Sequence, residues 1–171
     1  MQENGELVEL PTTMTSLDFR AFFAEEHASL FKTLYFVTGD RSEAADLAQE
    51  AFLKMWERWD RVEQIRDPVA YLFQIALNGS RMRARAARRA ALRPLPFVTV
   101  RDPFDDVDVR EEVRTMLRTL APRQRAALVL LDLYGYGSEE AAQIMGIRPS
   151  TVRALATQGR AVLRTTGGAH E

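Results

Sequence analysis

The chain has 171 residues, 46% of them hydrophobic, which is enough to bury a core as one domain or two small ones. It contains no cysteine and only two histidines, which excludes disulfides, thiolate metal sites and cysteine nucleophiles; we expect no metal or cofactor, and a cytoplasmic location is the simplest interpretation. The net charge of −1 argues neither for nor against a nucleic-acid partner.

The first fifteen residues are acidic and polar, and they lack the basic start and apolar stretch of a signal peptide. We therefore expect a disordered tail over 1–15, with either Met1 or Met14 as the true start. No run of about 18 apolar residues occurs, so we expect no membrane insertion. Apolar residues from Leu17 to Val37 have helical spacing, and Ser16 can cap the start of that helix.

A second helix is expected from Ser42, as its N-cap, to about Trp59. Its core stripe consists of Ala44, Leu47, Ala51 and Met55. Two aromatic residues, Phe52 and Trp56, lie four positions apart beside this stripe. A loop should follow over 60–66.

A third helix is expected from Pro68 to about Ala91, because Asp67 supplies a capping carboxylate directly before a proline at the first helical position. Its first half is amphipathic. Its second half, residues 81–89, contains arginines and few large apolar residues, so it should project from the core as a basic helix.

Residues 94–109 contain three prolines and an acidic run, which predicts a linker. Helices should resume over 109–120 and from Pro122 to about 134–137. No segment has the alternation of a strand. The predicted fold class is therefore all-α: two small helical domains, 16–93 and 110–165, joined by a flexible acidic and proline-rich linker, with a tail over 166–171.

The C-terminal domain ends in a helix-turn-helix pattern. Ser138 can cap the first helix, Gly146 permits the positive φ that ends it, and Pro149 begins the second. Small residues on one face of the second helix predict close packing on a neighbour. The opposite face offers short hydrogen-bonding groups and two cations, which suit phosphates and base edges in a major groove. The DNA-binding candidates, with two flanking arginines included, are Arg123, Arg148, Ser150, Thr151, Arg153, Ala154, Thr157, Gln158 and Arg160.

Charge alternates along the chain in four blocks. Residues 1–64 carry 6 basic and 13 acidic side chains, and residues 65–101 carry 8 and 1. Residues 102–140 carry 5 and 9, and residues 141–171 carry 4 and 1. Each positive block is a candidate polyanion-binding surface, and each negative block should face another kind of partner or simply solvent.

Three segments carry a resemblance to bacterial RNA polymerase sigma factors. Residues 38–56 (TGDRSEAADLAQEAFLKMW) and 67–78 (DPVAYLFQIALN) resemble the family's second region. Residues 117–131 (LRTLAPRQRAALVLL), followed by the helix-turn-helix, resemble its fourth region. The regions occur in the family's order with only a short linker between them. This is similar to the minimal layout of the extracytoplasmic-function group of the sigma-70 family.

The resemblance implies that the second helix binds the clamp coiled coil of core RNA polymerase. The acidic first block would suit a basic partner, and the aromatic residues would anchor the interface; burial of Phe52 and Trp56 in the core is the alternative. The polymerase-binding candidates are Asp46, Gln49, Glu50, Phe52, Leu53 and Trp56. The family's other implied partners are the polymerase flap, promoter DNA and an anti-sigma factor.

The third helix is implied to meet the promoter's minus-ten element. Its candidates are spaced by 3 or 4 residues and share one stripe, on which an aromatic and an amide lead into arginines, a combination that suits unstacked bases and phosphates. The preceding loop is implied to receive a flipped base. The candidates for both are Trp59, Asp60, Tyr71, Gln74, Asn78, Arg81 and Arg85. The family usually has tryptophan at Tyr71 and further basic residues near Leu155 and Gln158, so the grip on DNA should be weaker than is typical.

The predicted function is that of a dissociable promoter-specificity subunit, with no enzymatic activity of its own, that directs promoter recognition, strand opening and initiation. One alternative is a free-standing helix-turn-helix regulator whose N-terminal half senses a signal or dimerises. Another is an all-helical adaptor that binds only proteins. Specific transcription with core polymerase would distinguish the three.

Overall fold

A computed structural model describes residues 12–89 and 110–167. Within these ranges the fold is all-α, as predicted. The elements in chain order are α1 (Thr12–Thr38), α2 (Arg41–Trp56), η1 (Trp59–Gln64), α3 (Pro68–Arg89), α4 (Glu111–Leu117), α5 (Pro122–Leu128), η2 (Val129–Leu133), α6 (Ser138–Met145) and α7 (Pro149–Gly167). The predicted linker over 94–109 lies outside the described residues.

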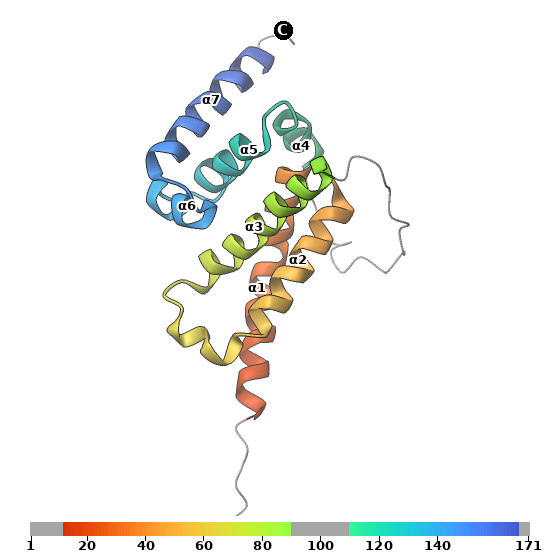
Figure 1. The fold of residues 1–171 in the computed structure, drawn as a ribbon, viewed down its shortest axis with the longest axis vertical. Coiled ribbons are helices and arrows are strands. Elements are labelled where there is room, and N and C mark those ends of the chain that lie inside the picture. The colour runs from red at the N-terminus through yellow and green to blue at the C-terminus, as the bar shows by residue number, and fades with distance from the viewer. Residues whose placement is uncertain (1–11, 90–109, 168–171) are drawn as a thin grey trace, which may run out of the picture.

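The first unit consists of α1, α2, η1 and α3, which pack side by side (Figure 1). Its core holds large apolar side chains from all three α-helices, among them Phe31, Leu34, Leu47, Met55, Leu72 and Phe73. Asp67 caps α3 as predicted, by accepting a hydrogen bond from the Ala70 amide at 2.9 Å.

Three boundaries in this unit differ from the sequence prediction. Helix α1 begins at Thr12, so Ser16 lies inside it and does not cap it. The N-cap of α2 is Asp40, whose carboxylate accepts from the Glu43 amide at 2.7 Å, and Ser42 is the second helical residue. Helix α2 ends at Trp56, and the 3₁₀ helix η1 occupies most of the predicted loop.

The second unit consists of α4, α5, η2, α6 and α7. Gly146 ends α6 with a φ of +63°, and Pro149 begins α7, both as predicted. Ser138 is the first residue of α6; Gly137 precedes it as the N-cap. Helix α5 continues into η2, a π-helical turn in which the Tyr134 amide donates to the Val129 carbonyl at 3.1 Å.

The buried face of α7 is built from small residues, as the sequence predicts. Val152 and Ala156 are fully buried on this face. Gly159 lies so close to α5 that a Cβ at this position would be 2.9 Å from Leu128 Cδ1. The glycine lets α7 approach α5 closely, and the residues on the opposite face of α7 are exposed to solvent.

The two units pack directly against each other and share one hydrophobic core. Helix α3 lies along α6, and α1 contacts α4 and α5 (Figure 1). The Phe73 ring of the first unit meets Tyr134 and Tyr136 of the second in edge-to-face contacts, with centroids 5.9 and 6.5 Å apart. We call this contact the seam.

Several hydrogen bonds cross the seam. The Tyr134 hydroxyl donates to the Ser29 carbonyl at 2.8 Å, and Arg114 donates to the Gly39 carbonyl at 3.2 Å. Arg125 donates to the Phe36 carbonyl at 3.5 Å, and its burial lowers the pKa of its guanidinium. The seam therefore combines apolar packing with donors that satisfy main-chain carbonyls within α1 and just after it.

Candidate nucleic-acid and protein-binding surfaces

An exposed stripe runs along α2. It consists of Asp46, Gln49, Glu50, Leu53 and Trp56, spaced by one to three residues. Leu53 is 62% exposed and Trp56 47% exposed, which is unusual for side chains of this size. Trp56 also lines a surface hollow with Phe19, Arg20 and Phe23. An apolar end next to a carboxylate-bearing end is a surface suited to a protein partner.

Phe52 does not belong to this stripe. It is only 4% exposed and packs among Phe19, Phe22 and Phe23, with ring centroids 4.6 to 6.5 Å away. The sequence placed it beside the core stripe of α2, and three phenylalanines of α1 bury that side of the helix. Phe52 is therefore a core residue and offers no surface to a partner.

The carboxylates of the α2 stripe are paired within the chain. Arg83 of α3 forms an ion pair with Glu50, and its second terminal nitrogen lies 3.8 Å from Asp46. Burial, reinforced by Asp40, raises the pKa of the neighbouring Glu43, while Arg83 opposes this rise. Arg83 thus reduces the negative charge of a stripe predicted to meet a basic partner.

The candidates on α3 share one face, as their spacing predicts. Asn78 and Arg85 are exposed, and Tyr71 is half-buried. The Tyr71 hydroxyl accepts a hydrogen bond from Arg58 at 2.5 Å. The basic half of α3 is not uniform, because Arg81, Arg83 and Arg85 point to the second unit, to α2 and to solvent, respectively.

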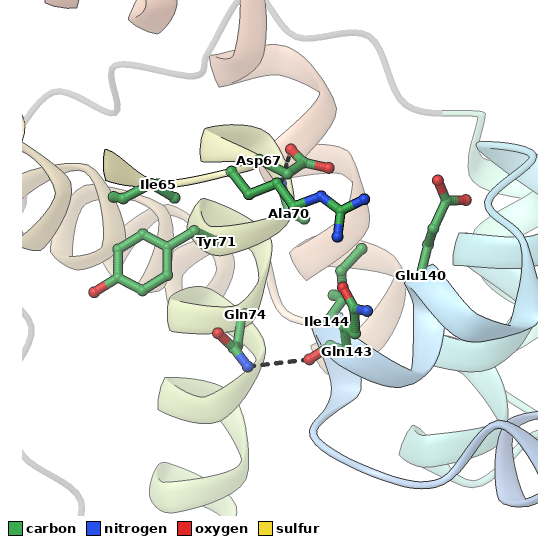
Figure 2. Close-up of a pocket in the computed structure, with 9 residues that line it drawn as sticks. Ile65, Asp67, Ala70, Tyr71, Gln74, Glu140, Gln143 and Ile144 are labelled. Atoms are coloured by element: carbon green, nitrogen blue, oxygen red, sulfur yellow. Dashed lines mark hydrogen bonds between the residues drawn. The ribbon is translucent and has the colours of Figure 1, made fainter. Parts of the chain in front are cut away.

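The middle of the α3 stripe is covered by α6. Gln74 donates from Nε2 to the Gln143 carbonyl at 3.0 Å, and Arg81 donates to the Met145 carbonyl at 2.8 Å. Figure 2 shows Gln74 reaching across to α6, while the Tyr71 ring points away from it. A cavity of about 510 Å³ opens at this end of the seam, between the start of α3 and α6.

Trp59 is a core residue. It is 7% exposed and packs against Phe19 and Phe22, with ring centroids 5.1 Å away in each case. It therefore cannot stack on a flipped base in this arrangement. Asp60 is exposed, with Arg61 3.9 Å away.

Sequence reasoning missed a polar hollow next to these residues. It is lined by Arg58, Arg61, Gln64, Ile65 and Tyr71. Two arginines three positions apart, in the segment between Trp56 and the Asp67-Pro68 helix start, were the available signal. Guanidinium groups beside a tyrosine ring can hold a phosphate and a base together, so this hollow has the chemistry that Trp59 lacks.

The helix-turn-helix candidates other than Arg123 lie on the open face of the second unit. On α7 all of them are exposed except Thr151, which is half-buried, and Arg148 is exposed in the turn. Arg123 is exposed at the start of α5, where it lines a small groove with Arg81 and Ala84 rather than lying on α7. The arrangement presents short polar groups on a protruding helix, as reading a major groove requires.

Two of the α7 arginines have partners within the chain. Arg153 donates to the Ser138 hydroxyl at 3.0 Å, so this serine binds the next helix instead of capping its own. Arg160 donates to both carboxylate oxygens of Asp132, and this hydrogen bonding raises the pKa of the guanidinium. Asp132 therefore neutralises the positive charge of Arg160 on the face of α7 that is predicted to meet DNA.

The second unit also has an apolar groove. Its lining residues come from α4, α5, η2 and α7, and they include Met116 and Leu133, both about half exposed. Asp132, the partner of Arg160, lies at the same groove. A groove of this kind can receive the apolar face of a partner helix.

Two searches across residues 12–89 and 110–167 bear on other functions. They contain no group of three or more histidine, cysteine, aspartate or glutamate side chains placed to hold a metal ion. None of their helices combines the length and apolar character that crossing a lipid bilayer requires.

In comparisons with known proteins, each of the two units matches its own family model. The family model described as Sigma-70 region 2 matches residues 22–90, and that described as Sigma-70, region 4 matches residues 110–163. The RNA polymerase sigma-E factor of Streptomyces avermitilis is 28% identical over 150 residues, covering 86% of this chain and 84% of that protein.

A second relative is the ECF RNA polymerase sigma factor SigJ of Mycobacterium tuberculosis. It is 32% identical over 145 residues, covering 77% of this chain but only 45% of that longer protein. Among solved structures, the sigma factor RpoE of Bartonella quintana, in complex with the anti-sigma factor NepR, has the same fold. Its TM-score is 0.69 at 23% identity, covering 90% of this chain and 99% of that one.

Proposed function

The chain belongs to the extracytoplasmic-function group of the sigma-70 family, and we propose that its two units divide the work of a promoter-specificity subunit. It binds core RNA polymerase and promoter DNA and directs transcription initiation. In this division the first unit holds the polymerase clamp and the minus-ten element, and the second unit reads the minus-thirty-five element. The observation that carries the proposal is the match of regions 2 and 4, in family order, to the two packed units.

The α2 stripe is the surface we assign to the clamp. Leu53 and Trp56 supply apolar anchors, and Asp46 and Glu50 supply charge for a basic partner helix. The groove that contains Met116 and Leu133 is the surface we assign to the flap. Two separate contacts on one enzyme raise the effective concentration of each, which would compensate for a weak grip by the α7 helix.

The exposed stripe of α3 and the Arg58–Arg61 hollow are the surfaces we assign to the opened minus-ten strand. The exposed face of α7, from Ser150 to Arg160, is assigned to the duplex of the minus-thirty-five element. These roles need no reaction catalysed by the chain itself. A polymerase subunit works on the bacterial chromosome, which places the protein in the cytoplasm, and an anti-sigma factor is its expected regulator.

Reconstitution tests this function. The purified chain is added to core polymerase with sheared genomic DNA of the host, and the 5′ ends of the transcripts are mapped. We expect new start sites that share a common upstream sequence and that are absent with core enzyme alone. A free-standing regulator would bind specific DNA without core enzyme and create no new start sites, and an adaptor that binds only proteins would do neither.

A further inference from the structure

Three carboxylates of α2 surround one guanidinium of α3. Glu43, Asp46 and Glu50 are spaced by 3 and 4 residues, so they share one face of α2. Arg83 forms an ion pair with Glu50 and has its second terminal nitrogen 3.8 Å from Asp46. Its charge also opposes the rise that burial causes in the pKa of Glu43. Two of these carboxylates, Asp46 and Glu50, belong to the α2 stripe.

Close packing of α2 and α3 positions Arg83 for these contacts. Gly79 lies so near α2 that a Cβ at this position would be 3.2 Å from Leu47 Cδ2, and Arg83 follows about one helical turn later. Beyond Leu77, which is buried, the described part of α3 carries one large apolar side chain, Met82, and this side chain is 70% exposed. The basic half of α3 is therefore held on α2 by ion pairs rather than by large apolar side chains.

The pairing has a consequence for the surface that we assign to the polymerase clamp. A cation of a basic partner helix can bind Glu50 only by displacing Arg83 or by sharing the carboxylate with it, and two cations at one carboxylate repel each other. We propose that Arg83 is an internal competitor of the clamp, which lowers the affinity of the chain for core polymerase. This inference rests on the proposed function, because it concerns the same α2 stripe.

The exposure of the three side chains allows the exchange of partners. Arg83 is 34% exposed, Glu50 48% and Asp46 61%. A displaced guanidinium regains contact with water, and ion pairs this exposed contribute little to stability, so a partner can break them. Arg83 should therefore reduce the affinity for core polymerase by a small factor without blocking binding.

The competition also changes how core binding depends on salt. In the wild-type chain, a new ion pair with the clamp replaces an internal one, so the number of ion pairs changes little on binding. Without Arg83, each ion pair with the clamp is an additional one. Because salt screens ion pairs between exposed groups, core binding should become more sensitive to salt when Arg83 is replaced.

Binding to core polymerase in the absence of DNA tests the competition. The affinity of the full chain is measured at several salt concentrations, and urea unfolding checks the stability of each variant. We expect Arg83→Gln to bind about threefold to fivefold more tightly at low salt and to lose this advantage as salt is raised. Arg83→Lys keeps the charge and should bind like the wild type. The control is Arg66→Gln, which removes the same charge from an exposed side chain between η1 and α3 and should change the affinity less than about twofold.

Glu50 provides a second readout. Glu50→Gln removes one ion pair with the clamp, but in the wild-type chain it also removes the internal pair that binding has to break. We therefore expect Glu50→Gln to weaken core binding by less than about twofold in the wild-type chain and by about threefold to fivefold in the Arg83→Gln background. A purely structural role of Arg83 predicts the opposite sign, because Arg83→Gln would then lower both the stability and the affinity for core polymerase.

The outcomes separate this inference from the proposed function. If Arg83→Gln binds no more tightly than the wild type while Trp56→Ala binds more weakly, the competition is wrong and the assignment of the α2 stripe stands. If Glu50→Gln has the same effect in both backgrounds, Arg83 does not act through this carboxylate and the competition is again wrong. If the wild-type chain itself does not bind core polymerase, the proposed function fails and this inference fails with it.

Discussion

Arg160 donates two hydrogen bonds to Asp132, from Nε to one carboxylate oxygen at 3.1 Å and from a terminal nitrogen to the other at 2.5 Å. Arg160 lies on the face of α7 that we assign to DNA, and Asp132 belongs to the π-helical turn η2. The pair is half exposed, so it contributes little to folding stability. Its importance is that a carboxylate stands next to a predicted phosphate contact.

Removing that carboxylate should strengthen DNA binding. In Asp132→Asn the charge that neutralises Arg160 is lost, so one more cation is available to phosphate. We expect the salt dependence of promoter binding by the holoenzyme to steepen by about one contact, and Arg160→Gln to make it shallower by the same amount. In the Arg160→Gln background, Asp132→Asn should change this salt dependence much less, because no guanidinium remains for it to release. Promoter binding by the holoenzyme is titrated at several salt concentrations, and the affinity of each variant for core polymerase is measured in parallel.

Gly159 tests the packing of α7 on α5. In Gly159→Val the new side chain overlaps Leu128, which is buried and cannot move away freely. Overpacking of this kind destabilises by about 1–3 kcal/mol. The control is Ala161→Val, on the exposed side of the same helix, where the change should be within ~0.5 kcal/mol. Urea unfolding measures both, and equal stabilities would contradict the close approach.

Two aromatic residues of α2 should separate folding from polymerase binding. Phe52→Ala removes a buried ring and should lower the free energy of unfolding by about 3–5 kcal/mol. Trp56→Ala should change stability much less but weaken binding to core polymerase by ~2 kcal/mol if this residue anchors the interface. Thermal unfolding and a core-binding titration are made on each. If Phe52→Ala weakened binding to core polymerase without lowering stability, the assignment of Phe52 to the hydrophobic core would be contradicted.

The hollow next to η1 has its own test. Arg58→Gln and Arg61→Gln each remove one cation from it, so each should reduce the salt slope of binding to a single-stranded minus-ten template by about 0.7. The measurement uses preassembled holoenzyme and a forked template without a minus-thirty-five element. Arg164→Gln, at the end of α7, removes the same charge from the other unit and should leave this slope unchanged.

Glu26 should make stability depend on pH. Burial, reinforced by Glu25 and Asp67, raises the pKa of its carboxyl above the ordinary value of 4.5. Because the folded-state pKa is the higher one, this group stabilises the fold when protonated, and that stabilisation is lost as the pH rises through the folded pKa. Glu26→Gln should therefore raise Tm at neutral pH, and this advantage should vanish at about pH 4. An advantage that grows on acidification would contradict the shift.

Most of the helices could be predicted because local signals determine them. Asp67-Pro68, Gly146 and Pro149 act within one turn of their own helix, and the apolar spacing of α7 identifies its buried face without knowledge of its neighbour. The N-cap of α2 was predicted wrongly, since both Asp40 and Ser42 can cap. The choice depends on Gly39, whose φ of +75° ends α1 and places Asp40 at the cap.

Burial of aromatic residues depends on partners that are distant in sequence. The period of α2 leaves Phe52 beside its core stripe, and only the phenylalanines of α1 decide that it is inside. The same aromatic cluster buries Trp59, so this residue is not available to the predicted pocket for a flipped base. The exposed members of the three candidate sets lie where their spacing predicts, but their contacts with polymerase and DNA remain predictions.

The seam has a property that bears on how this protein can evolve. Among the described residues, the hydrogen bonds reported across it have side-chain donors, and each ends on a main-chain carbonyl, at Ser29, Phe36, Gly39, Gln143 or Met145. A carbonyl survives almost any substitution of the residue that carries it. Substitutions should therefore be tolerated at the residues whose carbonyls accept these hydrogen bonds. They should be selected against at the residues whose side chains donate them. Pairwise covariation between the two halves should then report the apolar contacts of the seam, such as Phe73 with Tyr134 and Tyr136, and miss its hydrogen bonds.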